Sequence, residues 1–366
     1  MRDPDGTLTF HEGTVIRRLR DPLGADHFLR SELAQRWIAS GHLVKFELLD
    51  DRTAVAERLE FVTYPSEWSD AQLYEAAKLT LQLQVEALAQ GFDLKDASAW
   101  NIIFNGTNPV FCDLLSFVPL ASRKWWAAGQ FARHFLFPLA LAHRRGLHGY
   151  QSFAVWRDGI PSDAARGLFG LSRFLTRYWP LMARGNGAPA ASPQTAHRQD
   201  EVGGDSISSF RDRLNASLAW MLKGTRPKAL QANTAAQSWE GYADRRNHYS
   251  EEGVVAKRLC VGEWLSRLQP GWVADFGCNT GEFSRLALDH GASVIAIDAD
   301  HDSVERMFRT AQPSSRLFPV VATLVSVRQT HLEESSRNDN DAVQLANSWT
   351  VWKQNRVASA GTTAAS

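Results

Sequence analysis

The feature that most constrains this chain is a glycine turn that joins a predicted buried strand to a predicted helix. The run Val273-Ala-Asp-Phe-Gly-Cys-Asn-Thr-Gly-Glu-Phe283 predicts the strand, the turn and the helix start. A second apolar run, Ser293-Val-Ile-Ala-Ile-Asp298, predicts a neighbouring strand that ends in a carboxylate. Glycines let the backbone approach a ligand closely, and a carboxylate about 20 residues later can accept hydrogen bonds from ribose hydroxyls. The pattern therefore predicts a site for a nucleoside-bearing cofactor.

The spacing within the turn indicates which cofactor fits. A dinucleotide fingerprint has the form G-x-G-x-x-G and holds a pyrophosphate. This chain has Gly277-Cys-Asn-Thr-Gly281, with Asn279 where a middle glycine could stand, and Asp275 just before the turn. A carboxylate is a poor neighbour for pyrophosphate and a good partner for an ammonium group. Two alternatives stay open: NAD binding, and a βαβ unit whose glycines serve only the turn.

The segment resembles motif I of the class I S-adenosylmethionine-dependent methyltransferases, acidic-x-Gly-x-x-x-Gly. The resemblance covers about 265–323 and implies a Rossmann-like parallel sheet. It also implies that the methionine moiety lies near Asp275 and that the ribose lies on Asp298. The cofactor-binding residues that it implies are Asp275, Gly277, Cys278, Asn279, Gly281 and Asp298.

Composition sets wider limits. A chain of 366 residues favours two domains, and 44% apolar residues suffice for sizeable cores. The formal net charge is zero, so no overall field draws the chain to nucleic acid or to an anionic membrane. The sequence has no apolar run long enough to span a membrane and no secretory signal pattern. Its three cysteines are widely spaced and form neither a zinc pattern nor a disulfide framework, so we expect a cytoplasmic protein. The oligomeric state is left open.

A second group of polar residues carries its own chemistry. Asp96 and Asn101 are five apart, and Asp113 follows a hairpin signalled by Asn105-Gly106. The spacing resembles the catalytic loop of protein kinases and aminoglycoside phosphotransferases. That resemblance implies Asp96 as the base, Asn101 and Asp113 as magnesium ligands, and ATP as cofactor. The chain departs from the pattern because Leu94 stands where the family usually has His, and because no convincing glycine-rich phosphate loop precedes it. The alternative is that the three side chains only make turn and capping hydrogen bonds.

Both motifs occur together in a group of bacterial methyltransferase-like proteins, which resemble this chain over about 1–323. The fold class that we predict is α/β: an N-terminal α+β kinase-like domain followed by a Rossmann-like parallel sheet that is incomplete. The predicted divisions are a kinase-like domain at 1–184, a linker at 185–206, a partial methyltransferase domain with a helical lead-in at 207–323, and a disordered tail at 324–366.

Local patterns predict the elements within these divisions. They are a hairpin at 6–19, a helix at 26–39, strands near 43–49 and 58–63, a helix from Ser69 to about 90, helices within 123–182, a helix at 207–223, helical sequence at 238–265 and a strand at 317–322.

The sequence after Ala322 does not continue the methyltransferase pattern. It is polar and too short for four further strands with their crossovers, since one βαβ unit needs about 30 residues. We therefore expect a truncation or frameshift there, and no catalytic residue for methyl transfer can be named. The predicted function is S-adenosylmethionine-dependent methyl transfer to an unknown acceptor, impaired by the truncation. The alternatives are an ATP-dependent phosphotransferase and a non-catalytic remnant that binds a partner.

Overall fold

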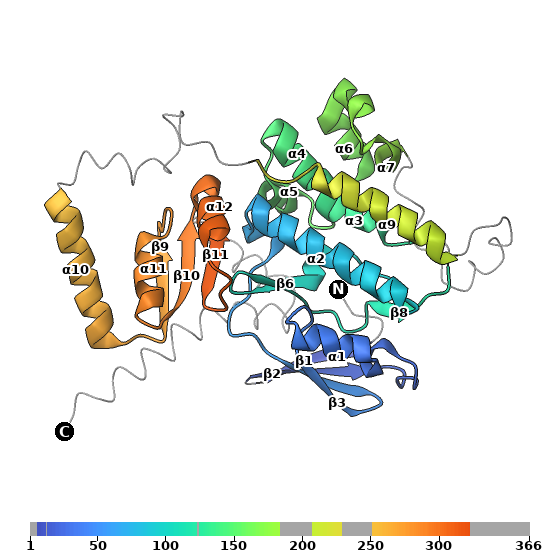
Figure 1. The fold of residues 1–366 in the computed structure, drawn as a ribbon, viewed down its shortest axis with the longest axis horizontal. Coiled ribbons are helices and arrows are strands. Elements are labelled where there is room, and N and C mark those ends of the chain that lie inside the picture. The colour runs from blue at the N-terminus through green and yellow to red at the C-terminus, as the bar shows by residue number, and fades with distance from the viewer. Residues whose placement is uncertain (1–5, 12, 123, 184–206, 229–250, 323–366) are drawn as a thin grey trace, which may run out of the picture.

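The computed structural model describes residues 6–11, 13–122, 124–183, 207–228 and 251–322. The predicted linker at 185–206, the predicted tail at 324–366 and the first part of the helical segment at 238–265 lie outside these residues. The described chain is a mixed α/β structure with an antiparallel sheet near the N-terminus and a small parallel sheet near the C-terminus (Figure 1).

The antiparallel sheet has the strand order β1-β2-β4-β3. Its elements are β1 Gly6–His11, β2 Thr14–Leu19, α1 Glu32–Ala39, β3 Phe46–Asp50 and β4 Thr53–Glu57. The predicted hairpin at 6–19 is confirmed, and Gly13 takes a φ of 73° in its turn. The strand predicted at 58–63 is wrong. The Asp50 carboxylate accepts a hydrogen bond from the Arg52 backbone N–H, so a tight turn starts the return strand earlier.

A long helix, α2 (Asp70–Ala89), forms the centre of the N-terminal part. Ser69 caps it as predicted, because its hydroxyl accepts from the Gln72 N–H while the Gln72 side chain accepts from the Ser69 N–H. The elements that follow are β5 Phe92–Leu94, β6 Ile102–Asn105, β7 Asn108–Phe111, β8 Phe117–Pro119, α3 Ala128–Phe131, α4 Phe137–Arg145, α5 Gly149–Val155, α6 Ser162–Phe169 and α7 Trp179–Ala183. The strands β6 and β7 form the predicted hairpin, and β5 pairs with β8.

The helix at 207–223 was predicted correctly, but it lies with the N-terminal part rather than with the parallel sheet. This helix, α9 (Ile207–Lys223), packs along α2 (Figure 1). Leu218 and Met221 belong to the large N-terminal core, and the fully buried Arg211 pairs with Asp93. Helix α9, which we predicted as part of the second domain, thus contributes to the hydrophobic core of the N-terminal part.

The parallel sheet has the order β11-β10-β9. Its elements are α10 Glu251–Leu268, β9 Trp272–Phe276, α11 Glu282–Asp289, β10 Ser293–Asp298, α12 His301–Thr310 and β11 Leu317–Val321. Both strand pairs are parallel, as the alternation of strands and helices predicts. Val294 and Ala296 are fully buried in the middle strand, where they pack beneath α11.

The parallel sheet meets the N-terminal part through β11 and α12, while β9 and α10 lie at the far side (Figure 1). Phe318 of β11 packs edge-on against Phe61, and Phe308 of α12 packs edge-on against Phe104. The β6–β7 hairpin touches the loop before β11, where Thr107 and Ser314 exchange hydrogen bonds. The two parts therefore share an apolar and hydrogen-bonded junction.

The outer edge of the parallel sheet is exposed. Among the described residues β9 pairs only with β10, and Phe276 at its end is half exposed. Large apolar side chains of α10 also face solvent, namely Val255, Leu259, Trp264 and Leu268. Within the described chain, no helix combines the length and the apolar character needed to cross a membrane.

Candidate functional site

The glycine turn after β9 has the conformation that its sequence requires. Gly277 and Gly281 take φ angles of 72° and 83°, and Asn279 between them takes 48°. Residues other than glycine rarely occupy this left-handed region, and Asn is one of the few that tolerate it. A Cβ atom on Gly281 would also lie 2.7 Å from the Met307 sulfur. Gly281 therefore serves both the turn and the close approach of α12.

Asp298 links the turn to the start of the next helix. One of its oxygens, Oδ2, accepts a hydrogen bond from the Asn279 N–H at 2.7 Å, and Oδ1 accepts from the Asp300 N–H at 2.9 Å. A carboxylate has about four lone-pair sites, so each oxygen can accept a further bond. The predicted ribose-binding residue thus lies beside the predicted turn.

Asp275 lies at the end of the neighbouring strand. Burial raises the pKa of Asp275, and the nearby charge of Asp298 raises it further. The Ser284 hydroxyl, which donates to Asp275 at 2.7 Å, acts in the opposite direction. Glu282 adds a third carboxylate in the first turn of α11, where a dinucleotide-binding site would hold its pyrophosphate. The carboxylates favour a ligand with positive charge at this edge.

Cys278 lies inside the same turn. The side chain is buried, and burial together with Asp275 and Asp298 raises the pKa of its thiol. A protonated, buried thiol is not a nucleophile. Cys278 therefore contributes its backbone to the turn, and its N–H and that of Gly277 both donate to the Ile297 carbonyl.

The residues of the second predicted group also converge. The side-chain amide of Asn101 donates to the Asp96 backbone carbonyl at 3.1 Å and to the Ser116 hydroxyl at 3.3 Å. Ser116 in turn donates to Asp113 at 2.5 Å. One polar chain therefore joins the loop that holds Asp96 and Asn101 to Asp113, which follows the β6–β7 hairpin.

Asp113 is already engaged by the protein. The Arg17 guanidinium, on β2 of the antiparallel sheet, donates to Asp113 Oδ1 at 2.9 Å, and the Leu115 N–H donates to the same oxygen. The largest effect on Asp96 is burial, which raises the pKa of its carboxyl. A magnesium ion at Asp113 would have to compete with the Arg17 charge.

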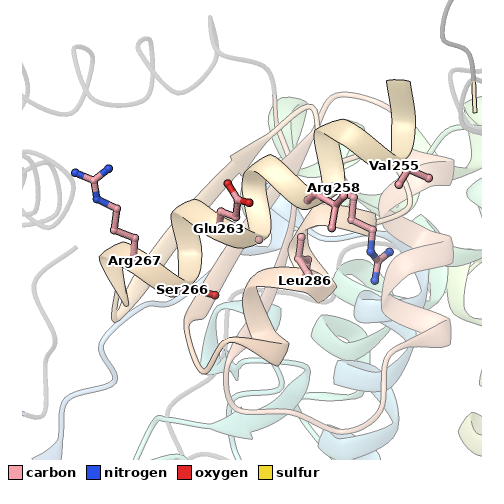
Figure 2. A pocket seen from close by; sticks show the side chains of 8 residues that line it. Val255, Arg258, Glu263, Ser266, Arg267 and Leu286 are labelled. Atoms are coloured by element: carbon pink, nitrogen blue, oxygen red, sulfur yellow. The ribbon is translucent and has the colours of Figure 1, made fainter. Parts of the chain in front are cut away.

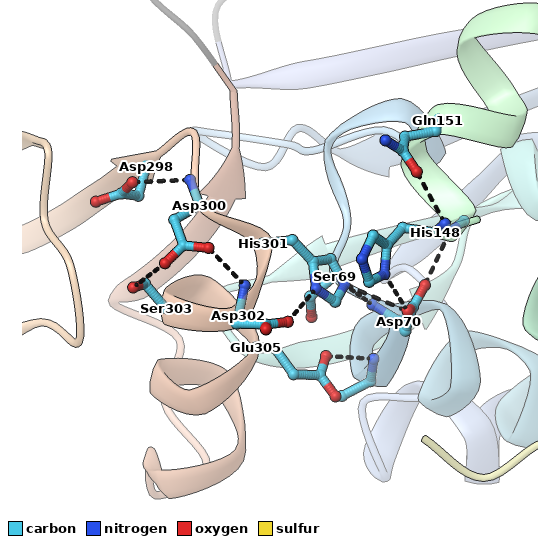
Figure 3. Close-up of polar contacts among 12 residues, drawn as sticks. Ser69, Asp70, His148, Gln151, Asp298, Asp300, His301, Asp302, Ser303 and Glu305 are labelled. Atoms are coloured by element: carbon cyan, nitrogen blue, oxygen red, sulfur yellow. Dashed lines mark hydrogen bonds and ion pairs between the residues drawn. The ribbon is translucent and has the colours of Figure 1, made fainter. Parts of the chain in front are cut away.

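A third cluster, which sequence reasoning missed, lies at the junction (Figure 3). Asp70 Oδ2 is 2.8 Å from His148 Nδ1 and 3.4 Å from His301 Nε2. Burial acts to lower the pKa of His301, but its hydrogen bond to Asp302 and the charges of Asp70 and Glu305 outweigh burial and raise it. The cluster residues are separated in sequence by 78 and 231 positions, so no spacing pattern could reveal them.

A shallow groove runs along α10, and Figure 2 shows the side chains that line it. The groove has a volume of about 630 Å³. Apolar groups of Val255, Leu259 and Leu286 line it, together with charged groups of Arg258 and Glu263. The groove contains neither Asp275 nor Asp298. It is thus separate from the glycine turn.

The fold and the turn define a mixed α/β protein in which a glycine-turn βαβαβ unit docks on an antiparallel-sheet and helical body. The chain is 31% identical to nodulation protein NoeA of Rhizobium meliloti (strain 1021) over 342 residues, which cover 87% of this chain and 70% of NoeA. It belongs to the NoeA family. No protein-family model and no solved structure matches the chain.

Proposed function

We propose that the chain binds S-adenosylmethionine at the turn after β9 and takes part in methyl transfer. The observation that carries this proposal is the pair of carboxylates, Asp275 and Asp298, at the carboxyl ends of two adjacent parallel strands, with the left-handed Gly277–Gly281 turn between them. Ligands of open parallel sheets bind at this edge. A cofactor with an ammonium and a sulfonium group complements this negative charge better than a pyrophosphate does.

Each residue has a distinct part in the proposal. Asp275 pairs with the ammonium group of the methionine moiety, and Asp298 accepts hydrogen bonds from the ribose hydroxyls. Gly277 and Gly281 have no side chains, so the ligand can approach close enough to contact the backbone of the turn. The cofactor supplies an already activated methyl group, so the protein contributes chiefly alignment of donor and acceptor.

The acceptor is not identified by these residues. NoeA is named for nodulation, and that name specifies no reaction. The exposed end of β9, with Phe276 half exposed, lies beside the turn and is where an acceptor could approach.

Isothermal titration with S-adenosylhomocysteine tests the binding step. Asp298→Ala should lower affinity by about tenfold or more, because a hydrogen bond to a charged group contributes about 1.5–3 kcal/mol. Asp289→Ala, an exposed carboxylate at the end of α11, is the matched control and should bind normally. Circular dichroism of both variants separates lost binding from lost folding. Wild-type protein that binds no adenosyl ligand would refute the proposal.

The convergence of Asp96, Asn101 and Asp113 supports a second candidate, a kinase-like N-terminal part. The arrangement resembles a catalytic loop followed by a metal-binding aspartate, with β5 paired to β8 and a hairpin between them. The Arg17–Asp113 ion pair, however, occupies the oxygen that would hold the metal. We propose that this part serves as a scaffold for the parallel sheet and does not transfer phosphate.

A further inference from the structure

We propose that Asp70, His148 and His301 bind one divalent transition-metal ion of the zinc class. The ion would fasten α2 and α5 of the N-terminal part to α12 of the parallel-sheet part. The inference does not depend on the cofactor, because none of the three residues belongs to the glycine turn.

The three donors lie at compatible distances. One ligand atom from each residue lies within 4.8 Å of the other two. Asp70 Oδ2, the shared carboxylate oxygen, is 2.8 Å from His148 Nδ1 and 3.4 Å from His301 Nε2. Two ligand atoms on one tetrahedral zinc ion, with bonds of about 2.0–2.1 Å, lie about 3.3 Å apart. Small side-chain rotations would therefore bring all three atoms onto one ion.

Neighbouring groups hold the donor atoms of Asp70 and His301 in orientations that are usual for metal ligands. His301 Nδ1 lies 3.0 Å from Asp302 Oδ1, which directs the proton to Nδ1 and leaves Nε2 as the acceptor that faces Asp70 (Figure 3). A carboxylate on the far nitrogen of a ligating histidine is a recurrent feature of zinc sites. The other oxygen of Asp70 accepts from the Gly149 N–H at 2.8 Å, so that Oδ2 alone is directed at the two rings.

The site can also be reached and is rich in negative charge. Asp70 and His301 side chains are 9% and 7% exposed, but His148 is 28% exposed and gives a route from solvent. Asp300, the N-cap residue of α12, and Asp302 in the first turn add two carboxylates. A divalent ion would partly neutralise these charges. The ion would displace the hydrogen bond from the Asp70 N–H to His301 Nε2.

Ligand type indicates the class of metal. Two imidazoles and one carboxylate suit zinc and neighbouring first-row ions, whereas magnesium and calcium prefer oxygen ligands throughout. Three protein ligands leave a position for water or another donor. The two rings stack with centroids 3.7 Å apart, so the binding of one ion in the plane of both rings requires them to tilt apart.

The experiment uses the full chain with Cys260→Ser, which removes an exposed thiol that would bind zinc on its own. After removal of metal with a chelator, zinc is titrated by calorimetry, and bound metal is counted by mass spectrometry. We expect one ion per chain, with Zn²⁺ favoured over Mg²⁺ and Ca²⁺. His148→Ala should weaken binding at least tenfold. Asp302→Asn, which keeps all three ligands, should weaken it about 10–100-fold. His290→Ala, an exposed histidine outside the cluster, should leave binding unchanged.

A second measurement covers variants that fold poorly. Cobalt replaces zinc in the wild-type chain, and visible absorption from a four-coordinate site should appear and then disappear when zinc is added. A wild-type chain that takes up no stoichiometric zinc would overturn the proposal and leave the cluster as a hydrogen-bonded junction. Equal zinc binding by the His148→Ala and His290→Ala variants would overturn it as well.

Discussion

The Glu305 carboxylate accepts a hydrogen bond at 2.7 Å from the backbone N–H of Ala71, a residue 234 positions earlier in the chain. Helix α12 thereby caps the first turn of α2, whose N–H groups have no partner within their own helix. Glu305 is 1% exposed, and its other oxygen is held by Arg309. The contact connects the two parts of the molecule through a helix end rather than through apolar packing alone.

Replacement of Glu305 by alanine should destabilise the chain by about 1–3 kcal/mol. The substitution leaves a buried backbone donor without its acceptor, and such a group costs that amount. Glu75→Ala, which breaks an exposed pair with Lys78 on the same α2 helix, is the control and should cost under about 0.5 kcal/mol. Urea unfolding of both variants measures the difference. Equal losses would mean that the Glu305 contact adds nothing to stability.

Gly106→Ala should be more destabilising than Gly13→Ala. Both glycines have positive φ, at 65° and 73°, so the backbone strain of about 1–2 kcal/mol is common to the two variants. A Cβ atom on Gly106 would lie 1.9 Å from the Ser314 carbonyl oxygen, whereas a Cβ on Gly13 meets nothing within 4 Å. The clash should add about 1–3 kcal/mol. The difference in melting temperature between the two variants measures the destabilisation caused by the clash alone. Equal melting temperatures would show that the β6–β7 hairpin does not contact the loop before β11.

The buried Arg211–Asp93 pair should tolerate joint replacement better than single replacement. Burial raises the pKa of Asp93 and lowers the pKa of Arg211 despite their mutual attraction, so desolvation is the larger effect on both. Asp93→Asn alone leaves a buried guanidinium without its counter-charge and should cost about 3–5 kcal/mol. The double variant Asp93→Asn with Arg211→Met should recover most of that loss in denaturant unfolding. Additive losses in the double variant would contradict this account.

Cofactor affinity should fall in mildly acidic buffer if Asp275 pairs with an ammonium group. Its pKa is raised in the folded protein, so protonation begins at a pH above the usual range of Asp and removes the charge. Ser284→Ala removes a hydrogen bond that lowers this pKa and should move the loss of affinity to higher pH. Calorimetric titration with S-adenosylhomocysteine at a series of pH values measures the affinity of each variant. The Asp275→Asn variant should bind S-adenosylhomocysteine weakly at every pH. If its affinity depends on pH as the wild type's does, Asp275 is not the partner of the ammonium group.

Magnesium and ATP together should give no thermal shift in the wild-type chain at millimolar nucleotide. The Arg17 charge holds Asp113, and a ligand that binds only weakly adds little stability by mass action. A magnesium-dependent shift that disappears in Asp113→Ala would instead support a phosphotransferase.

Local signals in the sequence predicted most of the elements. The Ser69 cap, the Asn105-Gly106 turn and the Gly277–Gly281 turn each depend on residues close together in the chain, and all three occur as expected. The Asp51-Arg52 turn contains no glycine or proline, so the sequence gives no signal that β4 starts at Thr53. The predicted strand at 58–63 therefore begins five residues too far along the chain. Predictions for the tail and linker stay predictions.

Contacts between distant segments could not be predicted in the same way. Helix α9 packs along α2, and its Arg211 pairs with Asp93 of β5. An amphipathic pattern does not specify which neighbours a helix contacts. The Asp70, His148 and His301 cluster requires three helix starts to meet, and only the folded arrangement of α2, α5 and α12 shows it.

The long separation of Glu305 from Ala71 also bears on how the chain is made. At about 5–20 residues per second on the ribosome, Glu305 is synthesised about 10–50 s after Ala71. A helix forms within about a microsecond, so α2 can form long before Glu305 is available to accept from its first turn. During the same interval Phe61 lacks its partner Phe318, and Phe104 lacks its partner Phe308. During that interval a chaperone, or a second nascent chain, has access to surfaces that the finished protein buries.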